Sequence, residues 1–418
     1  MFLAPCIFIA AHLFWAAQPT WACSKQSSTA KSSPVAASWY AGWHSSDFPL
    51  QDVSWHKYSR VIYAFATTTP NANVIGLQPS DEQLLPQFVQ TAHENEVSAI
   101  LSVGGWSGSR YFSSAVATDA NRTAFAEAIL NVVGKYKLDG IEIDWEYPAK
   151  QGIGCNIVST SDSANFLLFL QTLRRKAPKL ILSAAVSLTP FIGPDGKPMS
   201  DVSGFAKVLD YIEIMNYDVW GSFSPTVGPN APLNDSCAPT PSQGDSAVSA
   251  VMSWTKAGFP RQKIVLGVAS YGHSFHVEKS DAVDKSGNLN LYPPFNKALQ
   301  PAGDKWDGTA GGVDECGNPN VVGGVFDFWG LIAGGFLTAS GTAAKGILYQ
   351  YDKCSQTPFV YNPTSEVMVS YDDATSFGAK GRFIHEMGLA GFAMWQTGGD
   401  SNNILLDAIR SGMSMSSY

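Results

Sequence analysis

The chain has 418 residues, of which 45% are hydrophobic and 15% charged, so a large buried core is expected. Its formal net charge of −8 argues against nucleic acid as a partner, because phosphate binding needs grouped Lys and Arg side chains and the sequence holds no such group. Aromatic residues make up 12% of the chain and include 12 Trp, which is typical of proteins that stack ring-shaped ligands on exposed aromatic side chains.

The N-terminal segment is predicted to direct secretion. Residues 1–22 hold an apolar run that ends in small residues at Thr20-Trp21-Ala22, which indicates a signal peptide. A membrane anchor is the alternative, but the run contains two prolines and His12, and no later run reaches the roughly 20 apolar residues of a membrane span. Residues 23–34 are polar and are predicted to form a flexible arm. We therefore expect an extracellular protein without a membrane partner.

Four cysteines fall within the segment that is expected to fold: Cys155, Cys237, Cys316 and Cys354. In an oxidising compartment two disulfides are expected, although spacing leaves their pairing open. No CxxC or HxxxH pair indicates a zinc site, so no metal is expected. Sequons at Asn121 and Asn234 fit a glycosylated secreted protein.

From residue 35 onward, short β-rich runs alternate with amphipathic helical patterns. The predicted strands are Val35–Trp43, Arg60–Ala66, Val97–Gly104, Leu138–Trp145, Lys179–Ser187, Leu209–Tyr217, Lys263–Tyr271 and Gly388–Gln396. The predicted helices are Asp81–Glu96, Asp119–Lys137, Ser161–Ala177, Gly244–Ala257, Thr375–Met387 and Asp400–Gly412. Several strands are apolar nearly throughout, as expected of parallel strands buried on both faces. This pattern predicts an α/β fold, a (β/α)8 TIM barrel, while an open doubly wound sheet is the alternative.

The alternation is interrupted once, between the seventh and eighth predicted strands. Residues 272–371 are rich in Gly, Pro and aromatic residues, and a structureless loop of that length is implausible in a compact domain. The segment is predicted to be a small α+β subdomain inserted at the C-terminal rim, where the active sites of barrels lie. The barrel then comprises residues 35–271 and 372–418.

The fourth predicted strand, with the sequence LDGIEIDWEYP at residues 138–148, carries acids at every second position. Because alternate residues of a strand share a face, Glu142, Asp144 and Glu146 are expected to line the barrel interior, about 7 Å apart, while the apolar residues between them face the helices. Burying these carboxylates should raise at least one pKa strongly. Glu146, nearest the barrel mouth, is the candidate general acid. A solvated acidic edge strand is the alternative.

This strand resembles the D-G-x-D-x-D-x-E signature of the family 18 glycoside hydrolases. The chain also resembles that family at three further motifs: S-x-G-G at Ser102–Gly105, Met-x-Tyr-Asp at Met215–Asp218, and G-x-x-x-Y-G at Gly267–Gly272. Trp395 lies near the end of the eighth predicted strand, where the family also has a Trp. The resemblance covers residues 35 to about 412 and implies the barrel fold.

The resemblance implies a chitinase that cleaves β-1,4-linked N-acetylglucosamine polymers with retention, the nucleophile coming from the substrate's own acetamido group. The implied partners are chitin and chito-oligosaccharides, and neither a metal nor an organic cofactor is implied; a monomer is expected. The implied catalytic residues are Glu146 as acid and base, Asp144, Glu142 and Tyr217. The implied substrate-binding residues are Asp218, Met215, Trp395, Trp106, Tyr40, Phe65 and Tyr271.

Two positions depart from the family pattern. Glu142 stands where the family has Asp, and its extra methylene adds volume to a packed interior, where overpacking costs about 1–3 kcal/mol. If Asp144 is displaced as a result, turnover falls; the alternative prediction is therefore a chitinase-like protein that binds chitin oligomers without efficient cleavage. His273 stands where many relatives have Arg, which is expected to alter a sugar contact. A third reading is a barrel enzyme that acts on another N-acetylhexosamine linkage.

Overall fold

The computed structural model describes residues 33–240 and 243–415. The predicted signal peptide and nearly all of the predicted flexible N-terminal segment, residues 23–34, lie outside these residues. The barrel has eight parallel strands: β1 (Val35–Ala41), β2 (Arg60–Thr68), β4 (Ser98–Gly104), β5 (Gly140–Asp144), β6 (Ile181–Val186), β7 (Tyr211–Ile214), β8 (Ile264–Ala269) and β14 (Gly391–Trp395). Because β1 pairs in parallel with both β2 and β14, the sheet closes on itself. The short β3 (Ile75–Gly76) pairs antiparallel with the end of β2. The predicted TIM barrel is confirmed.

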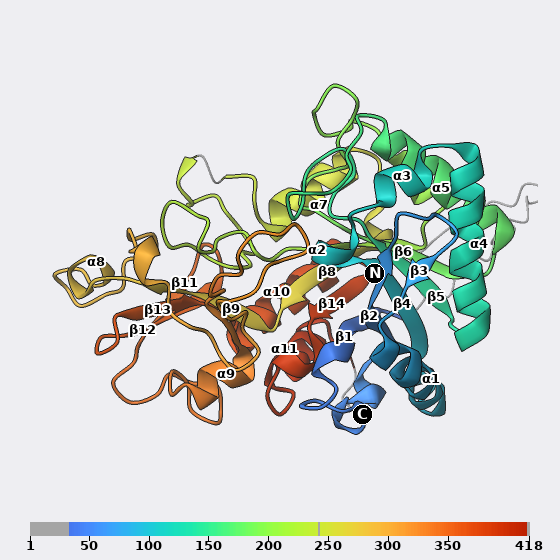
Figure 1. Ribbon diagram of the computed structural model, residues 1–418. Coiled ribbons are helices and arrows are strands. Elements are labelled where there is room, and N and C mark those ends of the chain that lie inside the picture. The colour runs from blue at the N-terminus through green and yellow to red at the C-terminus, as the bar shows by residue number, and fades with distance from the viewer. Residues whose placement is uncertain (1–32, 241–242, 416–418) are drawn as a thin grey trace, which may run out of the picture. The chain divides into compact units, whose positions relative to one another are not determined.

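Helices surround this sheet (Figure 1). The longer ones are α1 (Pro79–Glu94), α4 (Asp119–Tyr136), α5 (Asp162–Lys176), α7 (Ala247–Lys256), α10 (Ala374–Met387) and α11 (Ile404–Gly412), and the shorter ones are α2 (Gly105–Gly108), α3 (Phe112–Val116) and α6 (Ser203–Ala206). Helix α11 begins four residues after the predicted start. The Asp400 carboxylate accepts hydrogen bonds from the backbone N–H groups of Leu405 and Leu406, so Asp400 stands outside the helix and satisfies its first turn.

The inserted segment between β8 and β14 contains a five-stranded antiparallel sheet in the order β10-β9-β13-β12-β11. Its strands are β9 (Tyr271–His276), β10 (Val325–Asp327), β11 (Leu348–Asp352), β12 (Thr357–Asn362) and β13 (Val367–Ser370), with the short helices α8 (Lys279–Ala282) and α9 (Phe328–Ala333). This is the α+β insertion that the broken alternation predicts. Strand β9 starts two residues after β8 ends, so the insertion leaves directly from the barrel mouth.

Two disulfides, Cys155–Cys316 and Cys237–Cys354, join barrel loops to the insertion. All four cysteines that the sequence places in the folded part are therefore paired. In the part of the chain that the structure describes, no helix combines the length and apolar character needed to cross a membrane.

Candidate active site

The two faces of β5 carry different kinds of side chain. Ile141, Ile143 and Trp145 are buried in the large apolar cluster between barrel and helices, and the Trp145 ring stacks on Phe112 with centroids 5.1 Å apart. Glu142 and Asp144 belong to the opposite face, inside the barrel, and both are almost completely buried. The alternation of this strand therefore directs its acids inward, as predicted.

The glycines of the S-x-G-G segment allow β4 and its turn to pass close to the acidic strand. Gly104 and Gly105 adopt φ values of 118° and 76°, which side-chain-bearing residues rarely adopt. A Cβ atom on Gly104 would stand 2.0 Å from the carbonyl oxygen of Asp144, and one on Gly105 would stand 2.9 Å from the Phe65 ring. The two glycines thus leave room for the acidic strand β5 and for an aromatic side chain of the cleft.

Glu146 follows the end of β5 and is positioned by hydrogen bonds to its backbone. Its N–H donates to Ser109 Oγ (3.0 Å), and this hydroxyl also donates to the carbonyl of Asp144 (3.0 Å). Asn156 Nδ2 donates to the carbonyl of Glu146 (2.7 Å). These contacts hold the carboxyl-bearing residue at the mouth, where its side chain lines the cleft together with Asp144.

Glu142 is held away from the cleft by two donors. Its Oε2 accepts from Trp39 Nε1 at 2.6 Å, and its Oε1 accepts from Ser102 Oγ at 3.4 Å. Burial and then the charge of Glu213 raise the pKa of Glu142 well above the usual carboxyl range, although the two hydrogen bonds oppose this shift. Glu213, on β7, is also buried, and burial raises its pKa to about 8.

Asp144 lies between these deep acids and Glu146, and burial, followed by the charges of Glu146 and Glu142, raises its pKa well above the usual range. Among the described residues, none donates a hydrogen bond to its Oδ1. Burial also raises the pKa of Glu146 to about 7; a hydrogen bond from Tyr147 opposes this rise and the charge of Asp218 adds to it. Glu146 can therefore carry a proton near neutral pH and release it, which is what a general acid requires.

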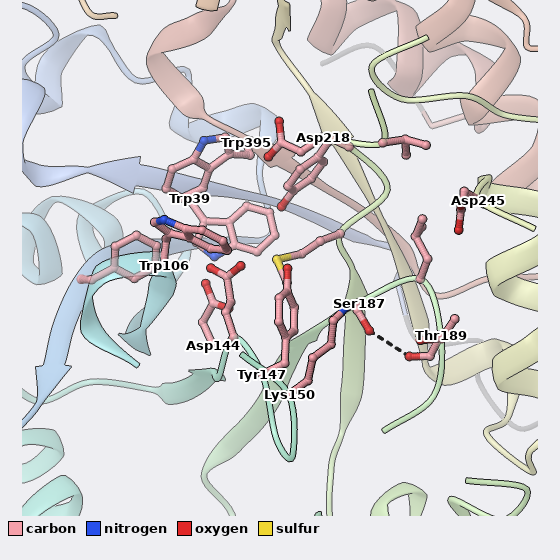
Figure 2. A pocket seen from close by; sticks show the side chains of 16 residues that line it. Trp39, Trp106, Asp144, Tyr147, Lys150, Ser187, Thr189, Asp218, Asp245 and Trp395 are labelled. Atoms are coloured by element: carbon pink, nitrogen blue, oxygen red, sulfur yellow. Dashed lines mark hydrogen bonds between the residues drawn. The ribbon is translucent and has the colours of Figure 1, made fainter. Parts of the chain in front are cut away.

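A cavity of about 510 Å³ opens above these acids. Figure 2 shows Trp39, Trp106 and Trp395 gathered at one end of it, and Asp245 at the other. The Trp395 ring stacks on Phe65 with centroids 5.6 Å apart, and the Trp106 side chain is 50% exposed. Flat aromatic faces beside acids are suited to the apolar faces of sugar rings. The cavity lining includes eight predicted residues: Phe65, Trp106, Asp144, Glu146, Met215, Tyr217, Asp218 and Trp395.

Asp218 faces Glu146 from the segment after β7. Its Oδ1 accepts from Tyr271 Oη and pairs with His273 Nε2, both at 2.7 Å. Burial favours the neutral acid, but the His273 contact and the Tyr271 hydrogen bond lower its pKa below the ordinary value. Asp218 is therefore an anion that helps to keep a proton on Glu146. Tyr271 lines an adjoining compartment of the same cleft, and His273 contacts Asp218 beside it.

The prediction that Tyr40 binds sugar is wrong. Its ring is 1% exposed and lies in the outer cluster, 6.0 Å from Phe88, and its hydroxyl donates to the carbonyl of Phe48. The neighbouring residue Trp39 points inward instead and lines the cavity, because consecutive residues of a strand face opposite sides. Three cleft residues were not predicted, namely Trp39, Trp43 and Lys150, and neither was the buried acid Glu213. Strand alternation could have found Trp39, which shares a face with Ala37, and Glu213, which shares a face with Tyr211.

No group of three or more His, Cys, Asp and Glu side chains is placed to hold a metal ion within residues 33–240 and 243–415. The chemistry that this arrangement can perform is proton transfer from Glu146 within a cleft of aromatic side chains.

The model of the family "Glycosyl hydrolases family 18" matches residues 35–400. The chain belongs to this family. The family 18 relatives include a protein from Moniliophthora roreri named "chitinase-like effector", 52% identical over 380 residues that make up 90% of this chain and 92% of the relative. A protein of the same name from Moniliophthora perniciosa is 49% identical over 93% of this chain and 89% of its own length.

Among solved structures, a chitinase from Rhizomucor miehei superposes on this family 18 chain with a TM-score of 0.81 and 32% sequence identity. The match covers 90% of this chain and 99% of that chitinase. These three proteins carry two kinds of name, chitinase and chitinase-like, and each matches nearly the whole of this chain.

Proposed function

We propose that this family 18 protein is an extracellular hydrolase of chitin and chito-oligosaccharides, with Glu146 as general acid and then general base. The observation that carries the proposal is the Glu146 carboxyl, whose pKa is raised to about 7, placed in the cleft beside the buried Asp144. The Trp395 and Phe65 rings form an apolar surface next to these acids, which suits the face of an N-acetylglucosamine ring.

In the proposed reaction Glu146 donates its proton to the oxygen that bridges two sugars, and the leaving sugar departs with that oxygen. The carbonyl oxygen of the substrate's acetamido group attacks C1 at the same time and forms an oxazolinium ion. Asp144 Oδ1, which lacks a donor among the described residues, accepts the acetamido N–H and stabilises the positive charge that develops there. The Glu146 carboxylate then takes a proton from water, whose oxygen attacks C1. The bond between C1 and the acetamido oxygen breaks, which restores the acetamido group and leaves the product with the retained configuration.

The other residues of the cleft are proposed to hold and orient the sugar during this reaction. Tyr217 and Asp218 hold the distorted sugar, Trp395 lies beneath it, and Met215, Trp106, Phe65 and Tyr271 contact it or its neighbours. Secretion is supported by residues 1–22 of the sequence and by the two disulfides, which persist in oxidising compartments. We further propose a monomer in which residues 35–271 and 372–418 catalyse and residues 272–371 form one wall of the cleft.

A second candidate is a chitin-oligosaccharide-binding protein that turns its ligand over poorly. The specific observation is that Glu142 accepts hydrogen bonds from Trp39 and Ser102, while the described residues contain no hydrogen bond between Glu142 and Asp144. Donors that occupy both Glu142 oxygens compete with the sharing of a proton between Glu142 and Asp144 during the reaction. The name "chitinase-like effector" of the Moniliophthora relatives fits this candidate.

Incubation of the purified protein with chitohexaose separates the two candidates. Mass spectrometry that detects dimers and trimers, at a rate proportional to protein concentration, supports the hydrolase. Hexamer that binds in calorimetry but stays intact supports the binding protein, and hexamer that neither binds nor breaks contradicts both.

The Glu142→Asp variant tests whether the longer side chain of Glu142 lowers the rate of turnover. If the longer acid impairs turnover, the shorter one increases the rate of hexamer cleavage; an unchanged rate removes Glu142 as an argument for the binding protein.

A further inference from the structure

A hairpin-like arm, residues 308–323, extends from the insertion. At its base the N–H of Gly323 donates to the carbonyl of Gly308 (3.3 Å), and midway Val313 and Pro319 form an antiparallel bridge. At its tip the N–H of Gly317 donates to the carbonyl of Asp314 (3.0 Å), which closes a tight turn. We call residues 308–323 the arm.

The segment just before the arm is fixed to the loop that follows β1. The Trp306 ring stacks on His44 with centroids 4.1 Å apart and an interplanar angle of 9°. Trp306 Nε1 donates to Asp47 Oδ2 (2.8 Å), and Lys305 Nζ lies 3.2 Å from Asp47 Oδ1. The base of the arm is therefore attached to the barrel independently of its tip.

The tip of the arm is attached to the loops that follow β4 and β5. Cys316 forms the disulfide with Cys155, which lies nine residues after Glu146. Arg110, just beyond α2, donates from Nη1 to the carbonyl of Glu315 at 3.3 Å. One covalent bond and one hydrogen bond thus fasten the tip beside the loop that carries the proposed acid.

The insertion and the loop after β5 leave the barrel at different places. Counted round the barrel from β1, β5 is the fourth strand and β8, which the insertion follows, is the seventh. The compartment between them is lined by Tyr147, Lys150 and Gln151 on the β5 side and by Asp304, Trp306 and Asp307 on the insertion side. No described residue of the arm lines this compartment, and the Cys155–Cys316 disulfide joins its two sides outside that lining.

We propose that the arm and the Cys155–Cys316 disulfide close the cleft into a ring, so that a sugar chain enters by threading a free end beneath the arm. That the ligand is a chito-oligosaccharide rests on the function proposed above. The threading itself does not require that the ligand is cleaved. The ring consists of β5, residues 145–155, the disulfide, the arm, the rest of the insertion and β8, and β7 and β6 close it back to β5. The preferred ligand is then a short soluble chito-oligosaccharide or a loose chain end, and the interior of a chain packed in a chitin surface is excluded.

The test is a chito-octaose that carries a bulky globular group on both ends, compared with the same octamer blocked on one end and with the unblocked octamer. All are measured by stopped-flow association with Glu146→Gln protein, which prevents cleavage. We expect the free and singly blocked octamers to bind and the doubly blocked octamer to associate at least tenfold more slowly. Equal association of all three by this protein overturns the threading proposal.

Two variants test whether the arm is what slows the association of the doubly blocked octamer. In the first, two glycines replace residues 309–322 and Cys155→Ser removes the remaining thiol, which keeps the closing contact of Gly308 with Gly323. In the second, Cys155→Ser and Cys316→Ser release the tip alone. We expect both to accelerate association of the doubly blocked octamer, the first more than the second. If neither variant that folds does so, the arm is not the barrier and the proposal fails.

The matched control is Cys237→Ser with Cys354→Ser, which removes the disulfide that joins the segment after β7 to the neighbouring insertion sheet. It should lower stability without admitting the doubly blocked octamer. If the unblocked octamer does not bind to any of these proteins, the function proposed above fails, and this outcome differs from the one that contradicts threading.

Discussion

The outer and inner faces of the five-residue strand β5 carry side chains with opposite effects on stability. On the outer face Ile141 and Ile143 are fully buried among apolar side chains, where their contacts add to stability. On the inner face Glu142 and Asp144 are buried almost as completely, but their raised pKa values show that the fold disfavours their charge. Packing on one face therefore holds in place acids that are costly on the other, and only the inner face can serve the chemistry.

The largest expected effect on stability comes from the outer face. Ile143→Ala should lower the free energy of unfolding by about 2–5 kcal/mol, because it removes apolar contacts and leaves a cavity between barrel and helices. Chemical denaturation followed by circular dichroism measures this. The hexamer cleavage rate per folded molecule should change little, since Ile143 does not reach the cleft. As a control, Leu168→Ala removes an aliphatic side chain that is 44% exposed and should cost much less. Equal losses for both would contradict the division between the faces.

The buried acids should make stability depend on pH. Glu213 has a pKa of about 8 in the folded protein against an ordinary value near 4.5 when unfolded, so the folded state keeps its proton over this range while the unfolded state loses it. The stability that this group contributes is fully present below pH 4.5 and is lost as pH rises toward 8. Each unit of difference in pKa corresponds to about 1.4 kcal/mol.

Glu213→Gln should therefore flatten the fall in unfolding free energy between pH 4.5 and 8, measured by denaturation at a series of pH values. The exposed Glu386→Gln is the control and should leave the slope as it is. A slope that is unchanged in the Glu213 variant would mean that this acid is not the one that keeps its proton.

A smaller effect is expected at the donor that holds Glu142. Trp39→Phe removes the Nε1–H that lies 2.6 Å from Glu142 Oε2, and a buried acceptor left without its donor costs about 1–3 kcal/mol. We expect the hexamer cleavage rate to fall about tenfold, with a shifted pH profile because the pKa of Glu142 rises further. The control Trp55→Phe removes a hydrogen bond to the carbonyl of Leu50 in the outer cluster and should affect stability alone.

The smallest expected effect is at Tyr40, on the outer face of β1. Tyr40→Phe removes the hydrogen bond to the carbonyl of Phe48 and should cost about 0.5–1.5 kcal/mol of stability. Hexamer affinity, measured by calorimetry, should stay within twofold of the unchanged protein. A loss of tenfold or more would mean that Tyr40 reaches the ligand after all.

The barrel and the inward direction of Glu142, Asp144 and Glu146 could be predicted from the sequence because both follow from alternation along strands. Tyr40 was misplaced because a difference of one position in register turns a side chain to the other face, and both Trp39 and Tyr40 are aromatic. The pairing of Cys155 with Cys316 could not be predicted, since it depends on how the insertion folds back over 161 residues of sequence separation. The position of the arm, residues 308–323, could not be predicted either, because it depends on contacts between loops that are distant in the sequence.

The most direct measurement of the central claim compares the unchanged protein with its Glu146→Gln variant on chitohexaose, with cleavage followed by mass spectrometry and binding by calorimetry. The amide keeps the shape of the side chain but cannot donate the proton, and general acid catalysis contributes about 10²–10⁴-fold. We predict a loss of cleavage of this size, with affinity for the hexamer retained. Cleavage by the variant at a rate close to that of the unchanged protein would show that the acid lies elsewhere.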